Sequence, residues 1–111
     1  MRLTYHLAPR DSWQAAAPEA PLVAPSLAAD GFIHCTNGPA NMVETANRHF
    51  RDDPRAFVIL SIDLDLVTSP WRFEDAGRLY PHVFGPIDRA AILGAIDAPR
   101  DRNGVFLRFD A

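Results

Sequence analysis

The sequence predicts a compact α+β fold in which a small, mostly antiparallel sheet is packed by one main helix. Short apolar segments bounded by proline, glycine and aspartate are typical of strands, and five to seven of them can be placed along the chain. Only residues 39–51 have the length and the apolar stripe of a substantial helix. Strands do not alternate regularly with long helices, which disfavours a doubly wound parallel fold.

Length and composition limit the kinds of protein to consider. The 111 residues predict a single domain, 1–111, with 48% apolar and 23% charged residues, as in an ordinary globular protein. A net charge of -3 argues against a surface that binds nucleic acid through bulk positive charge. No segment approaches the roughly 18 consecutive apolar residues of a membrane span, and no apolar signal region opens the chain. We therefore expect a soluble, cytoplasmic protein without membrane contact.

The first strand is predicted over residues 2–7, where apolar and polar side chains alternate. This alternation places His6 near the end of the strand, on its more polar face. Pro9 ends the strand, and Asp11 or Ser12 is suited to cap a short helix that follows.

A surface loop is predicted next, over residues 18–25, because three prolines in eight residues forbid a stable helix or a central strand. Leu22 and Val23 are apolar enough to anchor this loop. Residues 26–29 then predict a short turn of helix.

The main helix is predicted over residues 39–51, with Thr36 or Asn37 as its cap. Glu44 and Arg48 have the i,i+4 spacing of an ion pair on its exposed side. The residues that share the buried stripe are Met42, Val43, Ala46 and Phe50.

The second half of the chain contributes most of the sheet. Residues 56–62 form a nearly continuous run of branched and aromatic residues, which predicts a central strand buried on both faces. Further strands are predicted over residues 71–75, 80–84 and 91–96. Residues 104–109 predict a last strand, which could close a hairpin with the strand before it.

Two segments combine these structural signals with ionisable groups. Residues 30–36, Asp-Gly-Phe-Ile-His-Cys-Thr, and residues 79–86, Leu-Tyr-Pro-His-Val-Phe-Gly-Pro, each set a histidine where stability alone would favour valine or leucine. Burying His6, His34 and His82 separately would require three sets of polar partners. We therefore expect the three imidazoles to line one cleft, whereas His49 is expected to be a partly exposed surface residue.

Several chemistries compete for this cleft. Three histidines could hold zinc, but the usual ligand spacings are missing and nothing orients a carboxylate from Glu74 or Asp75, so no metal is expected. Glu74 could have a raised pKa beside its aromatic neighbours or be a solvated carboxylate at a strand edge. Cys35 is expected to be a packed core thiol, because adjacent strand residues point to opposite faces and cannot form a Cys-His pair. A pocket that hydrogen-bonds a ribose, phosphate or carbonyl fits better, with aromatic side chains stacked on a ring: Tyr5, Phe32, Tyr80 or Phe84.

These segments also carry a family resemblance. Tyr5-His6, Trp13, residues 30–36 and residues 80–86, in this order, resemble the bacterial family named domain of unknown function 952, a name that carries no established activity. The resemblance implies a distant likeness to the ADP-ribosyltransferase fold, in particular to the tRNA 2'-phosphotransferases. Those enzymes bind NAD through a histidine at the end of the first core strand and carry a later His-hydrophobic-Ser/Thr pattern.

The resemblance also implies roles for individual residues. His6 and the His34-to-Thr36 segment are similar to the two histidine elements of that superfamily. Where the superfamily often has a glutamate that stabilises the ribosyl oxocarbenium ion, this chain offers His82, with Glu74 upstream as a substitute. His6 is followed by Leu7, where those enzymes have a glycine.

Together these observations predict a small-molecule site for NAD or another nucleotide-like ligand. The catalytic candidates are His34, His82 and Glu74, with His82 as the acid or base. The ligand-binding candidates are His6, Tyr5, Phe32, Thr36 and Tyr80. An alternative is a module that binds a ligand or a protein without catalysis, and a metal-dependent hydrolase is a weaker third option.

Overall fold

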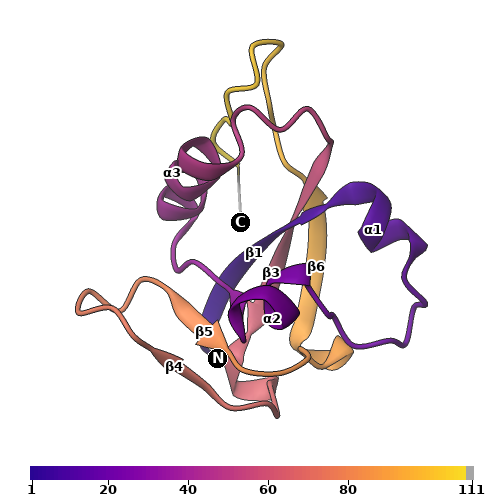
Figure 1. Cartoon of the computed structure of the whole chain (residues 1–111), viewed down its shortest axis with the longest axis vertical. Helices are drawn as coiled ribbons and strands as arrows, with labels where there is room; N and C mark the ends of the chain where they lie inside the picture. The colour runs from indigo at the N-terminus through magenta and orange to yellow at the C-terminus, as the bar shows by residue number, and fades with distance from the viewer. Residues whose placement is uncertain (110–111) are drawn as a thin grey trace.

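A computed structural model describes residues 1–109, which form an α+β domain built on two three-stranded antiparallel sheets (Figure 1). The first sheet has the order β1-β3-β6, from strands β1 (Leu3–Pro9), β3 (Phe57–Asp63) and β6 (Ile92–Asp97). The second has the order β2-β5-β4, from strands β2 (Ile33–His34), β5 (Pro81–Val83) and β4 (Trp71–Phe73). The helices are α1 (Arg10–Ala15), α2 (Pro25–Asp30) and α3 (Pro39–His49), with single 3-10 turns at Leu64–Leu66 and Arg89–Ala91.

The predicted α+β class and antiparallel pairing are confirmed, but the single predicted sheet is wrong, because the strands sort into two sheets. One bridge between Tyr5 and Thr36 joins them. The Tyr5 N–H donates to the Thr36 carbonyl at 3.0 Å, and the Thr36 N–H donates to the Tyr5 carbonyl at 2.8 Å. This bridge sets the start of α3 and the end of β2 against the middle of β1.

Strand β3 is the central strand that the apolar run predicts. It lies between β1 and β6, and its two faces enter different core clusters. Val58, Leu60 and Ile62 pack in one cluster, whereas Phe57 and Ile59 pack in the other. A two-sided core explains why the sequence here does not alternate with polar residues.

Strand β1 differs from its prediction in two respects. The alternating pattern predicted one apolar and one more polar face, yet every residue from Thr4 to Ala8 is buried, polar ones included. Tyr5 and Leu7 pack with α3, while Ala8 packs in the cluster on the opposite face. The strand also continues to Pro9, so His6 lies at its middle and not near its end.

Helix α3 packs through the predicted stripe, with Met42 and Ala46 buried. The predicted cap is wrong: the capping residue is Gly38, at φ +87°, and no side chain caps the helix. Thr36 is unavailable for capping because it is buried in the bridge to β1. The predicted Glu44–Arg48 ion pair is confirmed.

Three smaller predictions are corrected by the structure. Helix α1 begins directly after Pro9 and has no side-chain cap, so neither Asp11 nor Ser12 serves that role. Leu22 anchors the proline-rich loop by pairing with Ile87, but Val23 is 61% exposed. Residues 104–109 form no strand and contribute a single bridge between Arg100 and Phe106.

None of the helices between residues 1 and 109 has the length and apolar character that crossing a bilayer requires.

Candidate functional site

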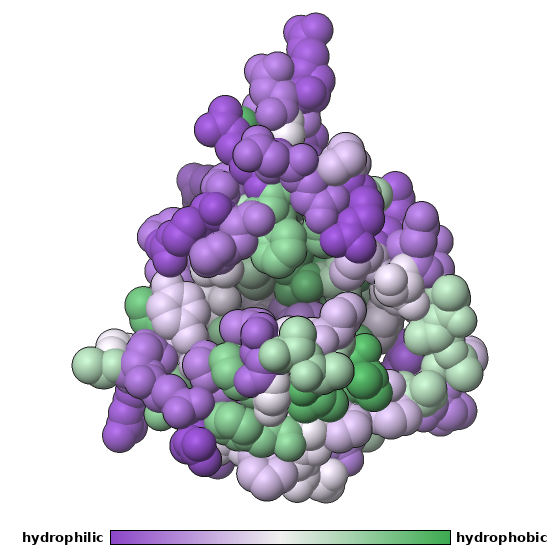
Figure 2. Space-filling model, viewed as in Figure 1, coloured by the Kyte–Doolittle hydropathy of each residue, from purple (hydrophilic) through white to green (hydrophobic). Residues whose placement is uncertain are grey.

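A cavity of about 970 Å³ opens on the face bounded by α1, α2, α3 and the start of β5, with β1 as its floor. Figure 2 shows the hollow at the centre of this face, with apolar surface inside and polar side chains around much of its rim. Its size lies in the range of small-molecule sites. Seven of the eight residues that the sequence singled out line it: Tyr5, His6, His34, Thr36, Glu74, Tyr80 and His82.

His6 is the best-defined polar group of the cavity. Its side chain comes from the middle of β1 and the residue is only 7% exposed. Its Nδ1–H donates to the main-chain carbonyl of His34 at 2.6 Å. Burial lowers the pKa of His6, an effect partly opposed by that hydrogen bond, so the ring is neutral at pH 7. A neutral ring that donates through Nδ1 keeps Nε2 as an acceptor, and Nε2 has no hydrogen-bond partner among residues 1–109.

His34 and His82 form a second imidazole group beside His6. They are direct cross-strand partners of β2 and β5, so both side chains leave the sheet on one face. Their ring centroids are 5.7 Å apart. The Phe32 ring stacks on His82 at 3.9 Å and 12°, and meets the edge of His34 at 4.6 Å. Phe32 does not line the cavity, so its ring holds the two imidazoles instead of facing the open space.

A carboxylate orients each of these two rings. Asp30 accepts from Nε2 of His34 at 3.0 Å, and Glu74 accepts from Nδ1 of His82 at 3.1 Å. When the carboxylate fixes the N–H in this way, the other ring nitrogen is left as the basic atom. His34 then presents Nδ1 and His82 presents Nε2. The sequence left two interpretations of Glu74 open. In the structure its carboxylate is half-exposed and binds His82.

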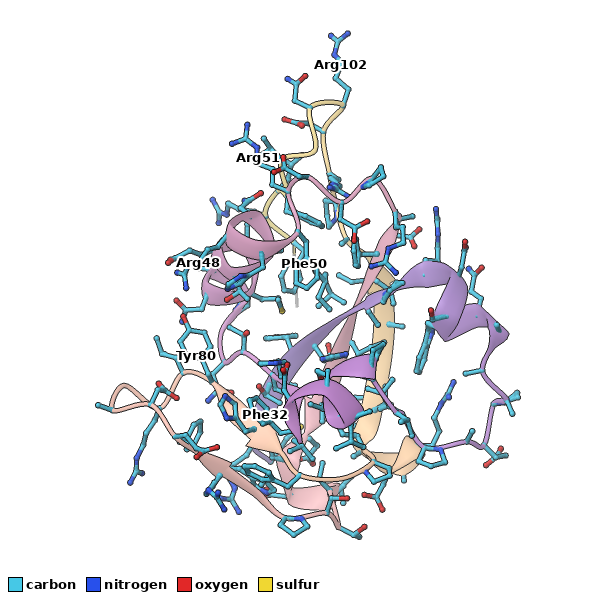
Figure 3. The ribbon with its side chains drawn as sticks, in the orientation of Figure 1. Phe32, Arg48, Phe50, Arg51, Tyr80 and Arg102 are labelled. Carbon is cyan, nitrogen blue, oxygen red and sulfur yellow. The ribbon has the colours of Figure 1, made fainter. Side chains whose placement is uncertain are left out.

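Tyrosines border the cavity at two depths. Tyr5 is buried, and burial raises the pKa of its hydroxyl, which stays neutral. Tyr80 lies closer to the rim, where Figure 3 shows it below Arg48 of α3. The contact with Tyr80, and secondarily the ion pair with Glu44, raises the pKa of Arg48. Asp75 fixes the chain before β5 by accepting from the N–H groups of Leu79 and Tyr80, and these bonds lower its pKa.

Several other residues line the cavity that the sequence did not identify as part of a site. His49 is exposed, as predicted, but it also lines the cavity, together with Arg48 and Arg55. Trp13 of α1 borders the opposite end. A helical pattern identifies the side of a helix that packs in the core, and it does not reveal that the rim of that side opens into a cavity.

The geometry gives little support to metal binding or to a cysteine nucleophile. Within residues 1–109, no three His, Cys, Asp or Glu side chains are placed to hold a metal ion. The Cys35 thiol is buried, as predicted, and burial raises its pKa to about 12, which leaves it without thiolate character at neutral pH. The remaining chemistry is that of imidazoles and carboxylates.

Fold and cavity together define a class of protein, a small α+β domain with a histidine-lined cavity. The chain belongs to the family described as Protein of unknown function (DUF952), whose model matches residues 7–95. This bears out the family resemblance, whereas the likeness to ADP-ribosyltransferases stays a prediction.

Solved structures of one protein, CC0527 from Caulobacter crescentus, are similar to this chain. The crystal structure has 26% sequence identity and a TM-score of 0.78, covering 95% of this chain and 93% of CC0527. A crystal structure of a double mutant of CC0527 gives a TM-score of 0.77 at the same identity and coverage. The solution NMR structure gives 0.69 at 27% identity, covering 95% of this chain and 91% of CC0527. No protein with a curated description matches the chain.

Proposed function

We propose that the cavity binds NAD or another nucleotide-like ligand and that the protein is an ADP-ribosyltransferase-like transferase. The observation that carries this proposal is the state of His6, buried, neutral and fixed by the His34 carbonyl, with Nε2 left as an acceptor in a large cavity. Nε2 of His6 opens into the cavity, where a ligand donor can meet it in place of water. A ribose hydroxyl is such a donor.

The two carboxylate-bound imidazoles supply the acid-base chemistry in this proposal. Transfer from NAD breaks the bond between ribose C1' and the nicotinamide nitrogen, and nicotinamide leaves with the electron pair. An acceptor hydroxyl attacks C1' and passes its proton to Nε2 of His82. Glu74 then stabilises the resulting imidazolium through Nδ1–H, while His34 orients the ligand.

Two arginines of the cavity lining suit the phosphates of such a ligand. They are Arg48 of α3 and Arg55, which precedes β3, and guanidinium groups bind phosphate oxygens well. Both have acidic partners in the free protein, Glu44 and Asp53, so a phosphate would have to compete with these ion pairs.

Calorimetric titration with NAD, ADP-ribose and AMP tests the binding step. The His6→Phe variant is expected to lose about 10-fold or more in affinity, because a phenyl ring of similar size has no acceptor where Nε2 lies. Thr4→Val is the matched control, since Thr4 is a buried polar residue of the same strand that does not line the cavity. Absence of binding by the unmodified protein at millimolar concentrations of all three ligands would refute the proposal.

Release of nicotinamide from NAD, followed by chromatography, tests the transferase step. His82→Gln should bind NAD with unchanged affinity but release nicotinamide at a strongly reduced rate. Binding without release in the unmodified protein would favour the ligand-binding module over the transferase. Elemental analysis of the purified protein separately tests the metal-dependent alternative.

A further inference from the structure

The cavity has a second lobe that the histidines do not reach. From His6 it continues along β1 past Ala8 to Pro9, between α1 and residues 21–25. The distance along the strand from His6 to Pro9 is about 10 Å, at roughly 3.4 Å per residue. Small apolar side chains and the indole of Trp13 line this lobe. Its chemistry therefore differs from that of the histidine end.

The wall of this lobe is held in place from both sides. Leu22 and Ile87 exchange two main-chain hydrogen bonds, of 2.8 and 3.0 Å. Arg89 donates to the carbonyls of Ala17 and Ala20 at 3.3 and 3.2 Å, and its guanidinium lies 4.0 Å from the centre of the Trp13 ring. The loop that precedes α2 is thus anchored at Ala17, Ala20 and Leu22, and these contacts fix its position without a ligand.

The apolar lining of this lobe is partly packed. Ala8 and Ala24 are buried in a core cluster, and Leu22 and Trp13 pack against that cluster. Trp13 is only half-buried, so part of its ring remains at the cavity wall. The hydroxyl groups of Ser12 and Ser26 border the same cavity, and neither has a hydrogen-bond partner among residues 1–109. An aromatic wall with a few unpaired polar groups at its margin suits a planar, heteroatom-bearing ring better than an aliphatic chain.

We infer that this lobe is the base-binding subsite of the cavity, with the nucleobase of the ligand packed on Trp13 and the ribose and phosphate at the His6 end. The inference rests on the proposed function and names the part of the ligand that each end recognises. Stacking on an aromatic side chain contributes to the affinity for a nucleotide and does not depend strongly on which base is bound. The lobe therefore selects ligands that carry a base over bare sugar phosphates.

Tryptophan fluorescence reports on this subsite directly. Trp71, the other tryptophan, lies in β4 outside the cavity lining, with Arg2 over its ring at 5.0 Å. The Trp71→Phe variant leaves Trp13 as the only tryptophan emitter. Titration of this variant with AMP is expected to change its emission at the concentrations where calorimetry detects binding. Ribose 5-phosphate, which is AMP without its base, should bind more weakly and leave the emission unchanged.

Two substitutions at Trp13 complete the test. Trp13→Ala should weaken AMP binding by about 10-fold or more, the order expected for loss of one stacked base, and leave ribose 5-phosphate binding unchanged. Trp13→Phe should retain most of the AMP affinity. Thermal unfolding of both variants establishes that the domain is still folded.

The outcomes separate this inference from the proposed function. If AMP binds without changing the Trp13 emission and Trp13→Ala binds it normally, the base subsite is wrong while the His6 site stands. If octanoate changes the emission and AMP does not, the lobe holds an aliphatic chain and the inference is overturned. If neither AMP nor ribose 5-phosphate binds to the unmodified protein, both the inference and the proposed function fail.

Discussion

Replacement of His6 by glutamine should change how the stability of the domain depends on pH. The imidazole is buried, and burial lowers its pKa below the ordinary value of 6.5 that it regains in the unfolded chain. Glutamine can still donate a hydrogen bond to the His34 carbonyl but does not titrate. The variant therefore removes a proton-binding site that differs between the folded and unfolded states.

The direction of this pH dependence follows from which state of the protein binds the proton. Below pH 6.5 the unfolded chain takes up a proton at His6 that the folded domain does not, so the free energy of unfolding falls as the pH falls. The loss is bounded by about 1.4 kcal/mol per pH unit for one group, so lowering the pH from 7.5 to 5.5 should cost at most about 1.4 kcal/mol through His6. The loss continues until the pH reaches the lowered pKa of the folded state. The aspartates with lowered pKa values, such as Asp53 and Asp75, act at more acidic pH.

Urea unfolding between pH 5.0 and 8.0 measures this effect, with the free energy of unfolding taken at each pH. His6→Gln should show a flatter profile than the unmodified protein across this range, whatever its absolute stability. His49→Gln is the control, because His49 is an exposed histidine of α3 and its removal should leave the His6 contribution in place. If His6→Gln and the unmodified protein have parallel profiles, the imidazole is not held neutral by burial.

The remaining predictions concern stability and reactivity. Arg100 donates to five main-chain carbonyls between residues 50 and 104. Arg100→Ala should therefore lower the free energy of unfolding in urea by about 2–4 kcal/mol. A loss no larger than that of Arg108→Ala, at an exposed arginine, would contradict this prediction. Gly38→Ala should lower the free energy of unfolding by about 1–2 kcal/mol, because φ is +87° and the new Cβ would lie 3.2 Å from a side-chain atom of α3. Gly94→Ala is the control and should be nearly neutral, because a Cβ there would meet no atom within 4 Å. Equal losses in the two variants would show that the φ of Gly38 does not matter. Cys35 should react with a thiol reagent about 100-fold or more slowly in native buffer than in urea, and rapid reaction of the folded protein would show that the thiol is accessible.

Much of the fold could be predicted because its signals are local. The branched run of β3, the apolar stripe of α3 and the prolines around α2 each act within a few residues, and each was placed correctly. Much of the candidate site could also be predicted, since His6, His34 and His82 line one cavity as expected. The rings do not share partners, however: each binds a carbonyl or carboxylate of its own. The cap of α3 was predicted wrongly, because Gly38 acts through its backbone conformation, whereas Thr36 and Asn37 have the side chains that usually cap a helix.

The site itself shows where local reasoning ends. Phe32 was expected to stack on a ligand, and its ring instead stacks on His82, a residue far along the chain. Trp13 was noted only as part of a family resemblance, yet it borders the second lobe. Contacts of this kind depend on how the loop at residues 21–25 and the second sheet are placed over β1. No periodicity within a segment encodes that placement.

The sequence by itself determined the antiparallel α+β class, the central strand, the main helix and most of the polar residues that line the cavity. Only the tertiary structure decided that the strands divide into two sheets, that β1 is covered on both faces and that His6 is neutral with Nε2 left as an acceptor. The physical reason is the separation along the chain over which each effect acts. Backbone preference and side-chain alternation act between neighbours in the chain, whereas burial, tautomer and cavity shape depend on groups that folding brings together from distant segments.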